Sequence, residues 1–275
     1  MRQAMKHVVM VYRAERFSPN SVGRDRAIID AVEALMKAKG HTVTSVNENE
    51  LDFDCHADVI LTMARSPEAL DILRAKEAEG CAVKNSPYGV MACRRSNIDS
   101  LMRAAELPAA PLNGNKGYWL KRGDEAAQNK EDVVFAKDEN EKNIAITRFN
   151  ERGVTDIVVT AHVVGDLVKF YGVRNTTFFR TFYPSDNGWS KFGDETVNGL
   201  PHHYTFPVGK LWQDADKLAS LAGVDIYGGD CIVKADGTYA IIDFNDWPSF
   251  AVCRDDAAEA IAMIAERQAD KKVKS

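Results

Sequence analysis

Residues 228–248 read GGDCIVKADGTYAIIDFNDWP, and this stretch decides the fold of the C-terminal part of the chain. The pair Asp236-Gly237 lies between two runs of apolar, β-forming residues, which is typical of a hairpin turn. Two antiparallel strands joined at this turn bring Asp230 and Asp243, thirteen positions apart, to the same end of the hairpin. Asn245 follows two positions later and projects from the same face of its strand as Asp243.

Three oxygen-bearing side chains therefore converge at one end of the predicted hairpin. Mg²⁺ is typically held by one or two carboxylates together with substrate phosphates and water. Asp230, Asp243 and Asn245 thus predict a magnesium site that serves a nucleotide. The alternative is that Asp-Gly forms an ordinary turn and the other acids are solvated strand ends. The hairpin alone supports both interpretations equally.

The same stretch resembles the C-terminal signature of the ATP-grasp superfamily, in which an Asp is followed after the same interval by an acid-x-Asn-x-x-Pro motif, here Asp243 to Pro248. Three further segments match the order of the family's motifs along the chain. They are Asn85-Ser86-Pro87 with Cys93-Arg94-Arg95 and a helix from Asn97 to Glu106, the strand Tyr118-Trp119-Leu120-Lys121, and the segment Ile157 to Phe170. The resemblance covers roughly two thirds of the chain and rests on this ordered set.

The resemblance implies which residues contact ATP and which act on the transferred group. Lys121 and Lys169 would contact the phosphates, and a hinge segment would follow the edge of the adenine. The hinge consists of Thr160, Ala161, His162 and Val163. Arg174 and Arg180 would stabilise charge on the transferring phosphoryl group or bind the acceptor. They would share a face if one unbroken strand carried both.

Two features depart from the family pattern. Arg95 stands where family members commonly have a lysine, and the sequence leaves open whether Arg95 or the adjacent Arg94 faces the nucleotide. The loop expected to cover the phosphates, residues 122–130, contains one glycine where the family usually has several. We therefore expect Arg122 or other side-chain donors to replace backbone amides there.

The N-terminal third predicts a small parallel sheet, because short apolar strands alternate with amphipathic helices. Strands are expected at residues 7–12, 41–46, 58–63 and 81–84, with a helix that begins at Ser66-Pro67. The predicted fold class is α/β (α+β): a Rossmann-like pre-ATP-grasp domain at 1–90 and a two-lobed ATP-grasp domain at 91–275. The small lobe over ATP is expected at about 112–163.

Composition limits the classes of function. The chain has 275 residues, of which 45% are hydrophobic and 27% charged, as in an ordinary globular protein. A net charge of −5 gives no general attraction for nucleic acid. Five scattered cysteines suit reduced thiols, and the sequence contains no apolar run long enough to span a membrane, so we expect a cytoplasmic protein. A homodimer is compatible with the family, but no interface pattern is evident.

The resulting hypothesis is an ATP- and Mg²⁺-dependent ligase that activates a carboxylate as an acyl phosphate for attack by an amine or similar nucleophile. A small-molecule kinase that phosphorylates a hydroxyl is the first alternative, because the C-terminal motif is also similar to that of inositol trisphosphate kinases. A non-catalytic ATP-binding module is the second. The substrate is expected to be a small anion, for which candidate contacts are Arg13, Arg16, Arg94, Arg95, Arg174 and Arg180. The aromatic-rich turn at 182–192 is expected near the acceptor.

Overall fold

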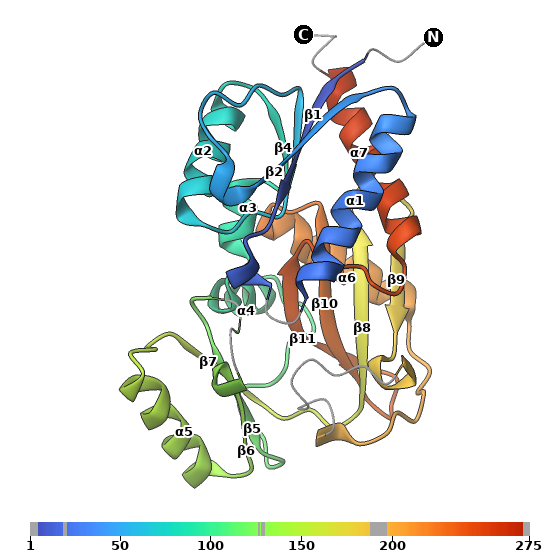
Figure 1. Ribbon diagram of the computed structural model, residues 1–275. Coiled ribbons are helices and arrows are strands. Elements are labelled where there is room, and N and C mark those ends of the chain that lie inside the picture. The colour runs from blue at the N-terminus through green and yellow to red at the C-terminus, as the bar shows by residue number, and fades with distance from the viewer. Residues whose placement is uncertain (1–4, 19–20, 126, 128–129, 188–196, 272–275) are drawn as a thin grey trace.

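A computed structural model describes residues 5–18, 21–125, 127, 130–187 and 197–271 of the protein, arranged as three sheets with their covering helices (Figure 1). The mixed α/β class predicted from the sequence is confirmed. Residues 126, 128 and 129 of the 122–130 loop and residues 188–192 of the aromatic-rich turn lie outside the described residues. No helix in the described part of the chain is long and apolar enough to cross a membrane.

The N-terminal sheet is parallel, as predicted, with the strand order β2-β1-β3-β4. Its strands and helices are β1 (His7–Tyr12), α1 (Val22–Ala38), β2 (Thr42–Asn47), β3 (Val59–Thr62), α2 (Pro67–Ala78) and β4 (Ala82–Lys84). Side chains of β1 alternate between the two faces: Val8 and Met10 pack with α1, whereas Val9 and Val11 pack with α2. Both faces are therefore buried, which explains why β1 is an uninterrupted apolar run.

The C-terminal helix α7 (Arg254–Lys271) packs against α1 on one face of this N-terminal sheet (Figure 1). Ile261 and Ile264 of α7 belong to the same core cluster as Val8 and Met10. The first and last elements of the chain thus share one hydrophobic core, which fixes the N-terminal sheet relative to the C-terminal half.

The small lobe is a three-stranded antiparallel sheet covered on one face by a helix. It consists of β5 (Tyr118–Arg122), β6 (Val133–Ala136), α5 (Glu139–Glu151) and β7 (Ile157–Ala161), with the strand order β6-β5-β7. Tyr118 and Leu120 pack with Phe149 of α5. Since side chains alternate along a strand, Trp119 and Lys121 face the other way, towards the C-terminal sheet.

The C-terminal sheet is antiparallel with the order β11-β10-β8-β9. Its elements, together with the helices near it, are α3 (Pro87–Ala92), α4 (Arg95–Ala104), β8 (Asp166–Val173), β9 (Phe179–Phe182), α6 (Val208–Ala222), β10 (Ile226–Val233) and β11 (Tyr239–Asp246). α4 and α6 cover one face, where Leu211, Leu218 and Phe244 are buried together. On the opposite face, Val173 and Ile226 pack in the core shared with α7, and the part of this face beyond them lines a cavity.

The hairpin predicted at Asp236-Gly237 is formed by β10 and β11. Gly237 adopts a φ of 78°, a left-handed conformation that suits glycine, and its N–H donates to the Lys234 carbonyl. A β-bulge interrupts the ladder next to Asp230, so that Asp230 pairs with Asp243 while Cys231 pairs with Ile241. Ile242 is the extra residue, and the bulge bends β11 just before Asp243.

Candidate nucleotide and metal site

A cavity of about 310 Å³ lies between the three sheets. The C-terminal sheet contributes polar side chains, the small lobe contributes the opposite wall, and the loops that follow β1 and β3 close one end.

Nine of the twelve site residues predicted from the sequence line this cavity, namely Arg95, Lys121, Thr160, Ala161, Val163, Lys169, Asp230, Asp243 and Asn245. His162, Arg174 and Arg180 do not line it.

The metal-binding candidates lie at the end of the β10–β11 hairpin, as the sequence predicts. Asp230 and Asp243 are direct cross-strand partners, and the Asn245 amide donates to Asp243 Oδ2 at 3.3 Å. The described residues contain no group of three or more His, Cys, Asp or Glu side chains that would hold a metal by themselves. Two carboxylates and one amide fit Mg²⁺ that takes its remaining ligands from phosphates and water.

Cationic side chains surround these carboxylates. Lys169, directly across the ladder from Asp230, donates to both of its carboxylate oxygens at 2.8 and 3.0 Å. The Nε of Arg95 lies 3.5 Å from Asp243 Oδ1. Burial opposes ionisation of Asp243, but Arg95 and Lys121 outweigh it and lower the pKa of this carboxyl to about 2. Asp243 is therefore an anion at neutral pH.

Lys121 reaches the site because of the bulge in β11. Its Nζ donates to the carbonyl of Ile242, the extra residue of the bulge, at 2.8 Å. Burial lowers the pKa of the Lys121 amine, and the neighbouring Asp243 carboxylate offsets only part of this effect. A half-desolvated ammonium group beside the carboxylates is well placed to contact a phosphate.

The hinge predicted under the adenine is split between the cavity and its surroundings. Thr160, Ala161 and Val163 line the cavity. His162 instead accepts a hydrogen bond at Nδ1 from Trp119 Nε1 at 3.0 Å, and burial lowers the pKa of its imidazole. His162 therefore contacts Trp119, and the Trp119 side chain in turn lines the cavity.

Of the two candidate arginines before α4, Arg95 lines the cavity and donates to the Arg122 carbonyl at 2.6 Å. Arg94 lies next to it, on a second cavity. Of the two arginines, Arg95 alone lines the first cavity, and its contact with a nucleotide stays a prediction.

Arg174 and Arg180 are not brought to the cavity. β8 ends at Val173 and β9 begins at Phe179, so one unbroken strand does not carry both arginines. Arg174 donates to Ser220 Oγ at 3.1 Å, and Arg180 forms an exposed ion pair with Asp256 at 2.8 Å.

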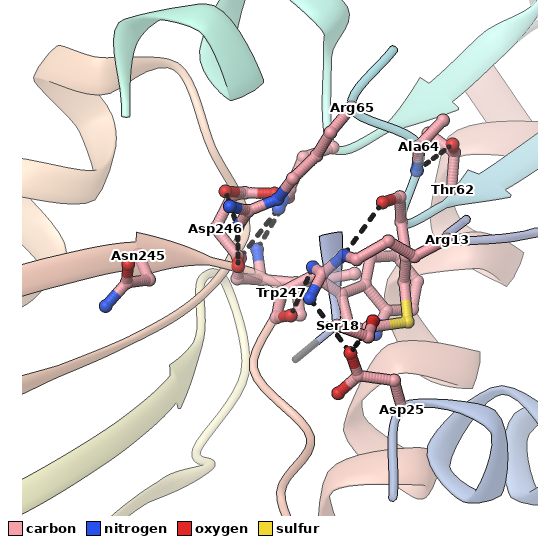
Figure 2. A network of polar contacts seen from close by, with 12 residues as sticks. Arg13, Ser18, Asp25, Thr62, Ala64, Arg65, Asn245, Asp246 and Trp247 are labelled. Atoms are coloured by element: carbon pink, nitrogen blue, oxygen red, sulfur yellow. Dashed lines mark hydrogen bonds and ion pairs between the residues drawn. The ribbon is translucent and has the colours of Figure 1, made fainter. Parts of the chain in front are cut away.

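At the N-terminal end of the cavity, sequence reasoning named Arg13 as a candidate contact but missed Arg65. Arg65 donates to Asp246 Oδ1 at 2.5 Å, and Arg13 pairs with Asp25 at 3.0 Å while donating to the Trp247 carbonyl (Figure 2). Arg65 lies three positions after the carboxyl end of β3, at the edge where ligands of parallel sheets gather, and this position was the signal that could have found it.

A buried glutamate holds the two loops in place. Glu48 accepts hydrogen bonds from the backbone N–H groups of Arg65 at 2.8 Å and of Ser66 at 2.7 Å, and also from that of Ala14. One carboxylate thus joins the loop after β1 to the loop after β3. It fixes the backbone beside Arg13 and Arg65 without entering the cavity.

Comparisons with known proteins agree on the fold. No family model matches the sequence, and no curated protein matches it. Among solved structures, D-alanyl-alanine synthetase A from Vibrio cholerae is similar with a TM-score of 0.68 and 10% identity, over 97% of this chain and 99% of that chain. A RimK domain ATP-grasp protein from Sphaerobacter thermophilus has a TM-score of 0.63 and 14% identity, over 94% and 99%. The ATP-grasp ligase PsnB has a TM-score of 0.58 and 15% identity, over 95% of this chain and 98% of that chain. The chain has an ATP-grasp fold.

Proposed function

We propose that the protein is an ATP- and Mg²⁺-dependent ligase that joins a carboxylate to an amine or similar nucleophile. The observation that carries the proposal is that two sets of side chains meet in one cavity of an ATP-grasp fold. The first set is the proposed metal ligands Asp230, Asp243 and Asn245, and the second is the cations Arg95, Lys121 and Lys169. Similar structures include a D-alanine–D-alanine ligase complexed with ATP and PsnB complexed with Mg and ADP. They support the same cofactors for this chain.

Each side chain has a role in this proposal. Asp230, Asp243 and Asn245 would hold Mg²⁺, which would neutralise negative charge on the phosphates of ATP. Lys121 and Lys169 contact phosphate oxygens as compact cations. Trp119 lines the cavity beside the hinge, where an indole ring suits contact with a nucleobase.

The reaction has two balanced steps. An oxygen of the substrate carboxylate attacks the γ-phosphorus, the bond between that phosphorus and the β–γ bridging oxygen breaks, and ADP leaves with the bonding electrons. The amine nitrogen then attacks the acyl carbon of the resulting acyl phosphate, the carbon–oxygen bond to phosphate breaks, and the nitrogen loses a proton. The residues of the cavity orient the reactants and stabilise charge.

The chain is proposed to divide into a pre-ATP-grasp domain at 1–90 and an ATP-grasp domain at 91–275, with the small lobe at about 112–163. In this arrangement the small lobe and the C-terminal sheet enclose the nucleotide. The N-terminal loops place Arg13 and Arg65 on the cavity wall, where these guanidinium groups would suit an anionic small molecule as the substrate.

The test measures ADP and free phosphate released from Mg·ATP by the purified protein, with pools of carboxylates crossed against pools of amines and polyols. ADP with an equal amount of free phosphate, dependent on both a carboxylate and an amine, is the expected result. ADP without free phosphate means that the acceptor kept the phosphoryl group, which contradicts the ligase in favour of a kinase. Nucleotide binding without turnover in any pool contradicts both and indicates a binding module.

A further inference from the structure

A second cavity of about 160 Å³ lies beside the first. Arg65, Arg95 and Asp243 line both cavities, so the two meet at the end of β11 that carries the proposed metal ligands. The remaining wall comes from the loop after β1, the start of α2, and the segment that joins α3 to α4, including Arg16, Pro67, Leu70 and Arg94. A group bound here is adjacent to the reacting end of the nucleotide site.

The acids of this second cavity already have cationic partners. Asp124 pairs with Arg122 at 2.6 Å, and Glu125 lies 3.6 Å from the same guanidinium. Asp246 pairs with Arg65, and Asp243 lies next to Arg95. Each of these four acids therefore already has a guanidinium partner other than Arg16 and Arg94.

Arg16 and Arg94 line the same cavity, and both are exposed. Within the described part of the chain, neither guanidinium has an ion pair; that of Arg16 lies 4.8 Å from the ring of Phe17. The buried Nε of Arg65 also has no hydrogen-bond partner among the described residues. The four carboxylates that line the cavity lie next to Arg65, Arg95 or Arg122, whereas Arg16 and Arg94 have no carboxylate partner in the parts of the chain that the structure describes and can donate to an added anion.

We propose that this second cavity binds an anionic group, carboxylate or phosphate, of the amine substrate, with Arg16 and Arg94 as its specificity-determining contacts. The inference rests on the proposed ligase function. An amine held by its anionic group in this cavity presents its nitrogen towards the shared wall, where the acyl phosphate forms in the first cavity. Neutral and cationic amines lack the group that the two arginines recognise.

The first experiment is a direct titration of the full chain, saturated with Mg²⁺ and the non-hydrolysable analogue AMP-PNP. Glutarate and inorganic phosphate are the two probes, and they distinguish a carboxylate from a phosphate site. We expect one of them to bind, and Arg16→Gln and Arg94→Gln each to weaken its affinity about tenfold, as expected for loss of a charge-assisted hydrogen bond. Arg148→Gln, an exposed arginine on α5, is the matched control and leaves the affinity unchanged.

The affinity for AMP-PNP, measured separately, is expected to be the same in all four proteins. The subsite is contradicted if neither anion binds the native chain, or if both arginine variants bind it as tightly as the native chain does. Failure to bind AMP-PNP contradicts the proposed function instead, and the same titrations without nucleotide then still decide whether Arg16 and Arg94 form an anion site.

Turnover gives a second, independent readout. Carboxylate-bearing amines, phosphoethanolamine and neutral amines are compared as nucleophiles in the ADP-release assay. We expect the KM of the preferred acidic amine to rise about tenfold in each variant, with the KM for ATP unchanged. A preference for neutral amines, with no change of KM in the variants, overturns the inference while leaving the ligase function intact.

Discussion

Replacing Asp243 with asparagine tests the centre of the site, because it keeps the shape of the side chain and removes its charge. The pKa of Asp243 is lowered from 3.8 to about 2. At about 1.4 kcal/mol per pKa unit, its ionised form is favoured by about 2 kcal/mol in the folded chain. The folded pKa lies below the unfolded one, so this stability is present above about pH 4 and is lost as the pH falls through about 2.

The variant is therefore expected to lose about 2 kcal/mol of unfolding free energy at pH 7, measured by urea denaturation without Mg²⁺ or nucleotide. It should also lose about 100-fold or more in Mg²⁺-dependent ATP affinity, since even outer-shell changes at metal sites cost up to that amount. Asn113→Ala, at an exposed position, controls for general effects of substitution. Mg·ATP affinity equal to that of the native chain would refute the assignment of Asp243 as a metal ligand.

Two further substitutions separate the binding and structural roles. Lys121→Met should weaken ATP binding about 10- to 100-fold at pH 7. Because burial lowers the pKa of Lys121, the ATP affinity of the native chain should fall with rising pH before an ordinary lysine would titrate. The variant should lack this fall. Calorimetric titration with ATP across pH measures both effects. Asn85→Ala should lower the free energy of unfolding by about 3 kcal/mol, measured by urea denaturation. The reason is that the buried Asn85 side chain donates to the Ile226 carbonyl and accepts from the N–H groups of Asp225 and Ile226. A loss below about 1 kcal/mol would contradict this role.

The features that the sequence predicted correctly depend on local patterns. The turn at Asp236-Gly237 is set by glycine's access to a positive φ, and the pairing of Asp230 with Asp243 follows from counting along two strands. The parallel N-terminal sheet follows from the alternation of apolar strands and amphipathic helices. Each of these inferences needs only neighbours in the sequence and the period of a strand or helix.

The features that the sequence did not predict depend on contacts between distant segments. Arg180 has the chemistry of a phosphoryl contact, but it pairs with Asp256, 76 positions away. Arg65 lies in the cavity because it pairs with Asp246, 181 positions away. Counting positions cannot distinguish these two arginines, since the packing of β3 and β11 around one cavity decides which of them faces it.

The pairing of Lys169 with Asp230 also bears on how the site works. Lys169 donates to both oxygens of Asp230, the same oxygens that the proposed function gives to Mg²⁺. A divalent cation at Asp230 would repel the ammonium group and compete for these oxygens, whereas a nucleotide phosphate would attract both cations. Lys169 can therefore exchange its carboxylate for a phosphate oxygen only when metal and nucleotide bind together. This exchange would couple the two ligands through one salt bridge, and it would give a physical reason for a lysine directly across the ladder from the aspartate that the proposed function assigns to Mg²⁺.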